Sequence, residues 1–281
     1  MRFPTGWHSH QGWDDNYQAQ SVNAGHNAFG GPLADIRANA CGAPETVPDA
    51  VRTADHSVRV TTEALADGVW LLGGSSHNSV AVEFEEYVAV VEAPLDERRN
   101  LAVIDEIVRL VPDKPIRFLV NTHQHHDHIG GLRTYMHIGA TIVTHWKNYD
   151  FYVRDVLNYA PRTLDPDMVA LWPPTELAEG YQYETVRENY WLSDGERSMH
   201  VSYVHPLAHV EGMLVAYLPN ERILIEADLF DSVPGEPPQR EATAANRALY
   251  AQVHRLGLDV ETIVPIHGRP VAWAGFVRLV E

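Results

Sequence analysis

The chain has 281 residues, of which 45% are hydrophobic and 21% are charged, enough to bury a sizeable core in one large globular domain. Its 38 acidic residues outnumber 21 basic ones, the formal net charge is −17, and no basic stripe is present, so nucleic acid is not an expected partner. No apolar stretch reaches the roughly 18 residues of a membrane span, so no membrane partner is expected either.

The sequence leaves compartment and assembly open. The single cysteine, Cys41, rules out an internal disulfide framework. The first residues lack the apolar centre of a secretory signal, although a signal removed before residue 1 would be invisible. Both a cytoplasmic and a periplasmic or secreted location therefore remain, and a homo-oligomer is not excluded.

Two segments differ in their patterning. Residues 1–57 are rich in Gly, Asn, Pro and Ala and show neither helical nor alternating apolar periodicity. We expect an irregular N-terminal extension there, an arm or a lid. Strand and helix patterns follow, so residues 58–281 are expected to form the main domain.

The main domain begins with predicted strands at residues 68–74, 79–84 and 87–94, rich in Val and Leu. Residues 101–111 then predict a helix that Pro112 closes before a strand at 116–121. The expected apolar face of this helix consists of Leu101, Ile104, Ile107, Val108 and Val111. The order of strand, helix and strand is typical of α/β proteins.

Further along the chain, residues 140–145 predict a strand and residues 149–157 a helix. Residues 158–195 hold prolines and aromatic residues with little regularity, so we expect an insertion that shapes a substrate pocket. Three strands, a helix that Gly257 ends and a last short strand complete the pattern. They cover residues 198–204, 212–218, 222–227, 241–257 and 262–268.

The segment NTHQHHDHIGG, residues 121–131, places four histidines and an aspartate directly after a buried strand. In an extended segment, alternate residues share a side, so His123, His125 and Asp127 can converge on one point. His128 requires the chain to turn, and the two following glycines supply that freedom. Imidazole and carboxylate ligands together suit zinc, and they also suit iron or manganese.

A bare His-x-His pair is weak evidence, because it occurs three times in this chain. The arrangement HxHxDH after a strand is much rarer. Three more residues with metal-binding side chains lie at strand ends, namely His209, Asp228 and His267. A closed ligand shell is therefore available from the sequence.

These motifs resemble those of the metallo-β-lactamase superfamily of hydrolases. The resemblance rests on HxHxDH at residues 123–128, on His209 with Gly212, on Asp228 and on His267 in PIHG, and it covers residues 61–281. It implies an αββα sandwich with the site at one edge between two sheets. It also implies two zinc ions per chain, one held by His123, His125 and His209 and the other by Asp127, His128 and His267, with Asp228 as the bridge.

The resemblance further implies a hydrolase of small molecules. Two metal ions roughly 3.5–4 Å apart can share a hydroxide that attacks an ester, lactone, thioester or amide carbonyl. Asp127 or Asp228 would accept or relay a proton. His77, in the loop between the first two strands, is a candidate for substrate contact, because that loop often borders the active site in this superfamily.

The sequence differs from individual branches of this superfamily, and these differences narrow the range of expected functions. Dedicated zinc β-lactamases generally lack the bridging aspartate, so Asp228 favours other hydrolases with weak β-lactamase activity at most. Only 14 residues follow His267, too few for the helical C-terminal domain of glyoxalase II, and the tyrosine that lactonases usually carry after the aspartate is absent. Two alternatives remain: a mononuclear iron dioxygenase acting on sulfur compounds, and a non-catalytic binding member of the fold.

Overall fold

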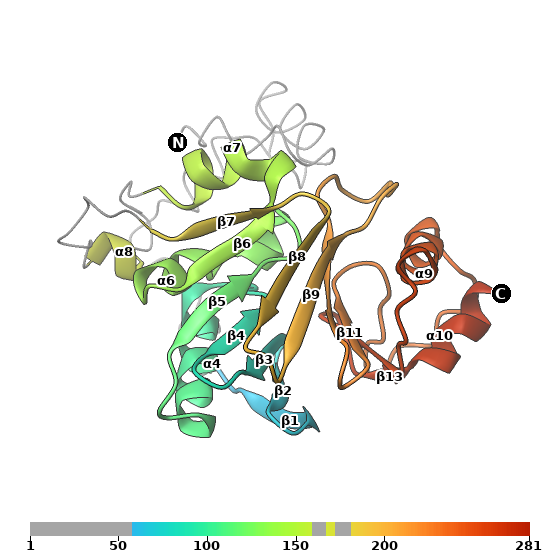
Figure 1. Ribbon diagram of the computed structural model, residues 1–281, viewed down its shortest axis with the longest axis horizontal. Helices are drawn as coiled ribbons and strands as arrows, with labels where there is room; N and C mark the ends of the chain where they lie inside the picture. The colour runs from blue at the N-terminus through green and yellow to red at the C-terminus, as the bar shows by residue number, and fades with distance from the viewer. Residues whose placement is uncertain (1–57, 159–166, 172–180) are drawn as a thin grey trace, which may run out of the picture. The chain divides into compact units, whose positions relative to one another are not determined.

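The computed structural model describes residues 58–158, 167–171 and 181–281. The expected extension at residues 1–57 lies outside the described residues, as do parts of the expected insertion. The described residues form two β-sheets packed face to face, with helices on both outer sides (Figure 1). This is the predicted αββα sandwich.

The first sheet contains seven strands in chain order. They are β1 (Thr61–Ala66), β2 (Val69–Gly73), β3 (Ser79–Glu83), β4 (Val88–Val91), β5 (Ile116–Val120), β6 (Thr141–His145) and β7 (Tyr183–Val186). Strands β1 to β4 pair antiparallel, and β4 to β7 pair parallel. Parallel neighbours point the same way, so the carboxyl ends of β4, β5 and β6 share one edge of the sheet.

The second sheet contains six strands in the order β13-β12-β11-β10-β9-β8. They are β8 (Asn189–Ser193), β9 (Ser198–Tyr203), β10 (Leu214–Leu218), β11 (Ile223–Glu226), β12 (Thr262–Pro265) and β13 (Val271–Ala272). Only β11 and β12 pair parallel within the described sheet. The ends of these two strands therefore lie side by side.

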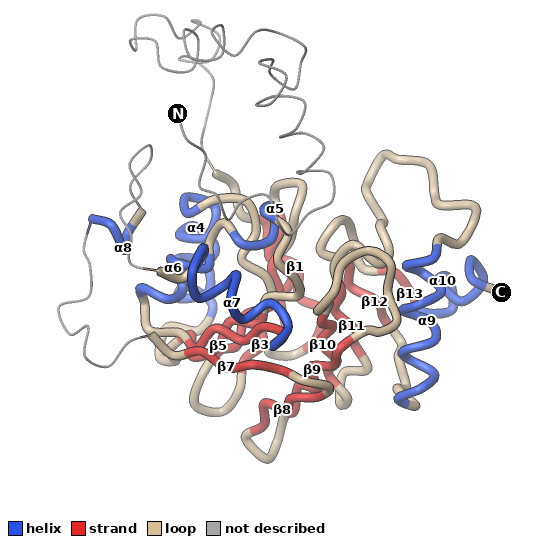
Figure 2. Tube along the Cα trace, turned by 90° about the horizontal axis from the view of Figure 1, so that it is seen from above, coloured by secondary structure: helices blue, strands red, loops and turns tan. Residues whose placement is uncertain are grey.

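Helices cover the outer faces, as Figure 2 shows from a second direction. They are α4 (Glu97–Leu110), α5 (His126–Ile129), α6 (Leu132–His137), α7 (Tyr149–Phe151), α8 (Met168–Leu171), α9 (Ala244–Leu256) and α10 (Trp273–Val280). Two short turns of other helix types, η3 (Trp146–Asn148) and η4 (Tyr152–Val156), flank α7. No helix in the described part of the chain is long and apolar enough to cross a membrane.

Hydrophobic side chains fill three layers. The central layer joins the sheets, for example through Val91 and Val120 of the first and Ile225 of the second. A second layer lies between the first sheet and its helices, and a third lies between the second sheet and the pair α9 and α10. Each sheet is thus covered on both faces, which explains why its inner strands, such as β4 and β10, are continuous apolar runs.

The apolar face predicted for α4 was right at Ile107 and Val111 but wrong at Val108, and it left out Val103. Val103 and Ile107 are fully buried, whereas Val108 is 51% exposed. The helix also begins four residues earlier than predicted, because the side chain of Asp96 caps it and accepts a hydrogen bond from Arg99 N. The polar side chains of Arg99 and Asn100 then turn inward and bind backbone carbonyls.

The prediction of an irregular stretch over residues 158–195 was wrong at its end. Strands β7 and β8 both lie in it. Each is at the edge of its sheet and leaves polar or aromatic side chains in solvent, such as Glu184 and Trp191. Edge strands of this kind lack the apolar run that a sequence pattern detects. The strands β1 and β13 and the helix α10 also escaped prediction.

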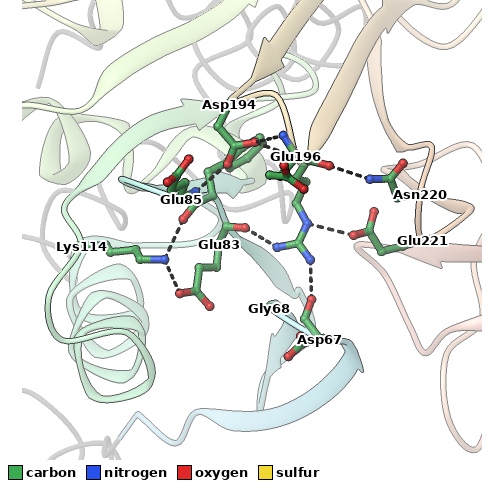
Figure 3. A pocket seen from close by; sticks show the side chains of 11 residues that line it. Asp67, Gly68, Glu83, Glu85, Lys114, Asp194, Glu196, Asn220 and Glu221 are labelled. Atoms are coloured by element: carbon green, nitrogen blue, oxygen red, sulfur yellow. Dashed lines mark hydrogen bonds and ion pairs between the residues drawn. The ribbon is translucent and has the colours of Figure 1, made fainter.

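Turns of both sheets meet where Asp67, Glu83, Asp194 and Glu221 line a pocket (Figure 3) together with Arg197. Its guanidinium donates to the carbonyls of Glu83 and Asp67 and to the carboxylate of Glu221. Gly68 has a φ of +68°, and a Cβ there would lie 2.6 Å from the guanidinium. This turn cluster, which lines a pocket of about 310 Å³, ties the two sheets together by ordinary ion pairs and hydrogen bonds.

Candidate metal centre

Eight side chains with metal-binding atoms meet where strands of both sheets end. From the first sheet come the loop after β2, the segment after β5 and the helix α5; from the second come the loop before β10 and the residues after β11 and β12. The eight are His77, His123, His125, Asp127, His128, His209, Asp228 and His267. The structure thus brings together all seven residues for which ligation was predicted and adds His77.

These side chains form two groups of four. The first group is His123, His125, His209 and Asp228, and the second is His77, Asp127, His128 and His267. Within each group, one ligand-type atom of every residue lies within 4.8 Å of those of the others. Each group is therefore compact enough to surround a single ion.

Asp228 lies between the two groups. Its Oδ2 is 3.2 Å from His123 Nε2 and 3.1 Å from His209 Nε2, both in the first group. Its Oδ1 is 3.2 Å from His128 Nε2 and 2.9 Å from His267 Nε2, both in the second group. One carboxylate thus presents a separate oxygen to each group, which is the geometry of a bridging ligand.

The chain turns earlier than the extended pattern requires. Helix α5 begins at His126, so Asp127 leaves the side of His123 and His125 and joins the second group. The two glycines after the motif have negative φ values, −62° for Gly130 and −97° for Gly131. They are needed for space instead, because a Cβ on Gly130 would lie 1.8 Å from the carbonyl oxygen of Leu95.

Buried polar atoms at the centre fit a cation. Among the described residues, neither His123 Nε2 nor Asp228 Oδ1 makes a hydrogen bond of acceptable geometry, although both atoms are buried. Unsatisfied buried polar atoms are costly and require a reason. Both atoms face the space between ligand groups, so their chemistry suits a bound divalent ion better than a purely structural role.

Glu92 is a functional residue that sequence reasoning missed. It follows β4, has a φ of +73° and is fully buried. Its Oε2 lies 2.7 Å from His128 Nδ1, while its Oε1 accepts a hydrogen bond of 2.6 Å from Thr122 N. This carboxylate fixes the ring of His128 so that Nε2 faces the centre, as is usual for histidine ligands. A glutamate directly after an apolar strand was the available signal.

Charges at the centre are strongly coupled. Burial opposes ionisation of Asp228, but the surrounding histidines outweigh it and hold the pKa of its carboxyl well below the usual range. Burial also opposes a charged His128, yet Glu92 and Asp228 raise its pKa to about 10. Burial and the neighbouring His128 lower the pKa of His123 to about 4. Without metal, these surroundings favour a proton on His128 and disfavour one on His123.

Glu226 supports the turn that carries Asp228, which itself has a φ of +62°. Its Oε2 accepts hydrogen bonds from the backbone N–H groups of Leu229 at 2.9 Å and Phe230 at 3.2 Å. Burial raises the pKa of Glu226 well above its usual value. A carboxylate inside the apolar run 223–227 was again a signal present in the sequence.

Gly212 allows the loop that carries His209 to pack closely against Asn148. Its φ is +86°, and a Cβ would lie 2.3 Å from Asn148 Nδ2. That amide donates to Gln124 Oε1 and to the carbonyl of Glu211, so it links the loop to the HxHxDH segment.

Five other histidines in the described part of the chain belong to neither group: His126, His137, His145, His200 and His205.

Comparison with known proteins agrees with this architecture. Residues 72–267 match the family model described as metallo-beta-lactamase superfamily. A metallo-beta-lactamase from Pontibacter korlensis has a TM-score of 0.58 and 15% identity, over 78% of this chain and 96% of its own. The FIM-1 metallo-beta-lactamase from Pseudomonas aeruginosa, in a mono-zinc form, has a TM-score of 0.52 and 19% identity, over 79% and 93%.

No curated protein matches the chain. At these identities the solved structures bear on the fold alone, while the family model spans well over half of the sequence. Together with the two groups of histidine and aspartate at the edge between the sheets, it settles the family. The chain belongs to the metallo-beta-lactamase superfamily.

Proposed function

We propose that the protein is a dinuclear metal-dependent hydrolase that cleaves an ester, lactone, thioester or amide bond of a small molecule, with zinc as its metal. The observation that carries the proposal is the position of Asp228, whose two oxygens face two separate ligand groups. A shared carboxylate offsets the repulsion between two cations held close together. A centre for one ion can also use an aspartate, but it does not need the two oxygens of that aspartate to face separate ligand groups.

The donor set supports zinc. It consists of six imidazoles and two carboxylates, with no thiolate among the described residues. Zinc accepts both ligand types readily, and iron or manganese accept them with less selectivity. The relatives that share the fold are named as metallo-beta-lactamases, and one is named in a mono-zinc form.

Two bound ions would supply Lewis-acid chemistry, which activates water and polarises a carbonyl group. The side chains of the protein set the positions of the ligand atoms. Glu92 orients His128, and Asp228 lies 14% exposed between the groups, where it holds both together. Asp127 is 32% exposed, so of the two aspartates it is better placed to receive a proton and pass it to solvent.

A pocket lies next to the loop that carries His77, although none of the eight side chains of the centre lines it. This pocket of about 420 Å³ is lined by Ser76 and Asn78, the two neighbours of His77, and by the cationic Arg269. Pockets of roughly 300–1,000 Å³ are typical of small-molecule sites. Asn78 also donates to the carbonyl of Gly268 at 2.6 Å, which joins this pocket wall to the segment of His267.

The direct test is elemental analysis of the purified protein, followed by ester, lactone, thioester and β-lactam substrates with and without chelator. We expect two zinc ions per chain and hydrolysis of at least one class that chelation abolishes and added zinc restores. Hydrolysis of β-lactams should be weak at most. One iron per chain with oxygen uptake on sulfur substrates would contradict the proposal, as would hydrolysis unaffected by chelation.

A further inference from the structure

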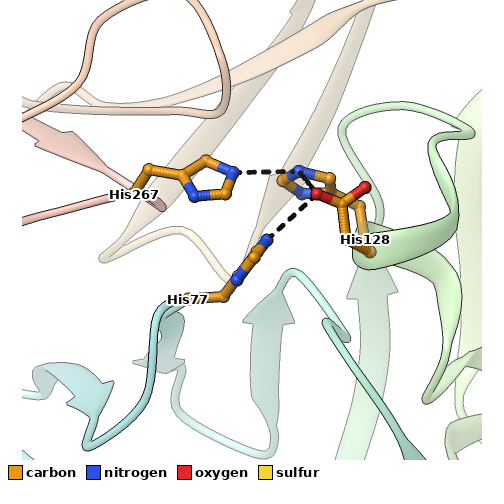
Figure 4. Close-up of side chains that lie close together, drawn as sticks. His77, His128 and His267 are labelled. Atoms are coloured by element: carbon orange, nitrogen blue, oxygen red, sulfur yellow. Dashed lines mark hydrogen bonds and ion pairs between the residues drawn. The ribbon is translucent and has the colours of Figure 1, made fainter. Parts of the chain in front are cut away.

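His77 lies in the loop between β2 and β3, and its ring points toward His128 and His267 (Figure 4). Its Nε2 is 3.3 Å from Asp127 Oδ2, and its ring centroid is 4.0 Å from that of His267. The residue is only 6% exposed. Its side chain therefore points into the second group and not toward a surface where substrate arrives.

The other ring nitrogen of His77 is already engaged. Ser76 Oγ lies 2.8 Å from His77 Nδ1. A hydroxyl on Nδ1 fixes the ring and, when it accepts that proton, leaves the lone pair of Nε2 toward Asp127. Histidine ligands usually carry an outer partner of this kind on the nitrogen that does not bind the metal. The seryl hydroxyl plays for His77 the part that Glu92 plays for His128.

The loop itself is held in place from two sides. Buried Arg99 donates to the carbonyl of Leu72 at 2.7 Å and reaches the carbonyl of His77 at 3.5 Å. Asn78 N donates to the carbonyl of Ile266 at 2.9 Å, directly beside His267. His77 and His267 are thus fixed to the same structural unit, so the ring of His77 has its position before any ion binds.

We infer that His77 is a ligand of the metal at the second position, in addition to Asp127, His128, His267 and the bridging Asp228. This inference rests on the proposed dinuclear centre but not on the bond that it cleaves. The second position then has five protein donors and the first has four, His123, His125, His209 and Asp228.

The inequality has a chemical consequence. Zinc is usually four-coordinate, and catalytic sites leave one place for water or substrate. The first position has as many protein donors as zinc usually takes and the second has one more, so an ion at the second position would be held more tightly and would be less open to water or substrate. Exchange with solvent and substrate then takes place at the first position, whose His125 and His209 are partly exposed.

The test is zinc affinity of chelator-treated protein in two backgrounds, each of which leaves one position intact. His209→Ala removes a donor from the first position and leaves the second intact, and His128→Ala does the reverse. Adding His77→Ala should weaken zinc binding at least about tenfold in the His209→Ala background and leave it unchanged in the His128→Ala background. Adding His254→Ala, an exposed histidine of α9 in neither group, should change neither.

A second variant, His77→Gln, nearly keeps the buried volume and should weaken the same position if His77→Ala does not fold. In cobalt-loaded protein, both variants should also change the visible absorption of one ion, because its coordination number falls. Equal zinc affinity with and without His77 in the His209→Ala background would overturn the inference, and a raised KM beside it would make His77 a substrate contact. Wild type that binds two ions and hydrolyses nothing would refute the proposed function and leave this inference intact.

Discussion

The two places where polar residues join the sheets differ in how their charges are balanced. In the turn cluster, Arg197 pairs with Glu221 and Lys114 pairs with Glu83, so the acidic residues meet cations of the chain itself. At the candidate metal centre, the ion pairs of Asp127 and Asp228 in the described part of the chain involve histidines alone. The turn cluster thus contains permanent cations for two of its carboxylates, whereas the candidate metal centre gains such cations when metal ions bind.

Removing a ligand should give the largest effect. His209→Ala takes one imidazole from the first group, and a shell that loses a member holds its ion poorly. We expect loss of one zinc per chain and a fall in hydrolysis of more than about 100-fold, since loss of a mere outer partner already costs about 10–100-fold. His125→Ala should show the same loss of zinc and of hydrolysis.

The matched control is His205→Ala, four residues away. His205 is half exposed, bonds Glu188 and belongs to neither group. Its zinc content, measured by elemental analysis, should equal that of the wild type. Full zinc content in His209→Ala or His125→Ala would refute the assignment of the first position.

Asp228→Asn should separate metal pairing from folding. An amide keeps the shape of the side chain but cannot offset the repulsion of two cations. We expect a folded protein by circular dichroism that binds fewer than two zinc ions. Asp194→Asn, which alters a carboxylate of the turn cluster that accepts from Glu85 N, should keep both. A fully loaded Asp228→Asn protein would argue against bridging.

Proton release should distinguish the two positions. With the pKa of His128 raised to about 10 by Glu92 and Asp228 against the effect of burial, this side chain is protonated at pH 8 in metal-free protein. With the pKa of His123 lowered to about 4, mainly by burial, that side chain is neutral. Zinc binding at the second position should therefore displace the proton of His128, whereas His123 has none to release at the first, so binding at the second position should release more protons per ion. Calorimetry in buffers of different ionisation enthalpy measures the difference.

The sign of the pH dependence follows from the same groups. Because the folded pKa of His128 lies above its ordinary value, its proton stabilises the metal-free fold below about pH 6.5, and this contribution is lost as the pH rises through about 10. For the loaded protein, zinc should leave below roughly pH 6, and excess zinc should lower that midpoint. Activity that fades in acid while zinc stays bound would point to another titrating group.

Arg197→Ala should give the smallest effect on function and a clear one on stability. It leaves the carbonyls of Glu83 and Asp67 and the carboxylate of Glu221 without their donor. We expect the free energy of unfolding to fall by about 2–4 kcal/mol in urea titrations, with zinc content unchanged. A loss of zinc in this variant would break the contrast between the two regions.

The strand and helix patterns predicted an α/β protein, and the resemblance of its local motifs to a known family predicted the sandwich and the seven residues that cluster. Buried strands are apolar runs, and His209, Asp228 and His267 each stand at or near the end of one. That these residues bind metal stays a prediction.

Features that depend on contacts between residues far apart in the sequence were not predicted. The role of Glu92 follows from a contact with His128, 36 residues away, and the burial of His77 follows from Arg99 beneath its loop. The edge strands β7 and β8 are fixed by their neighbours in the sheets, and their own side chains carry little signal. The face of α4 was misplaced because its inward side includes Arg99 and Asn100, which no apolar periodicity includes.

Each ligand group contains residues that follow strands of both sheets. The first group takes His123 and His125 from the first sheet and His209 and Asp228 from the second, and the second group takes His267 from the second sheet and the rest from the first. The chain passes from one sheet to the other between β7 and β8, at residues 187 and 188. A protein cut there would yield two fragments with incomplete ligand sets. Zinc would then add a second linkage to the central apolar layer between the sheets and would favour reassembly of the two fragments.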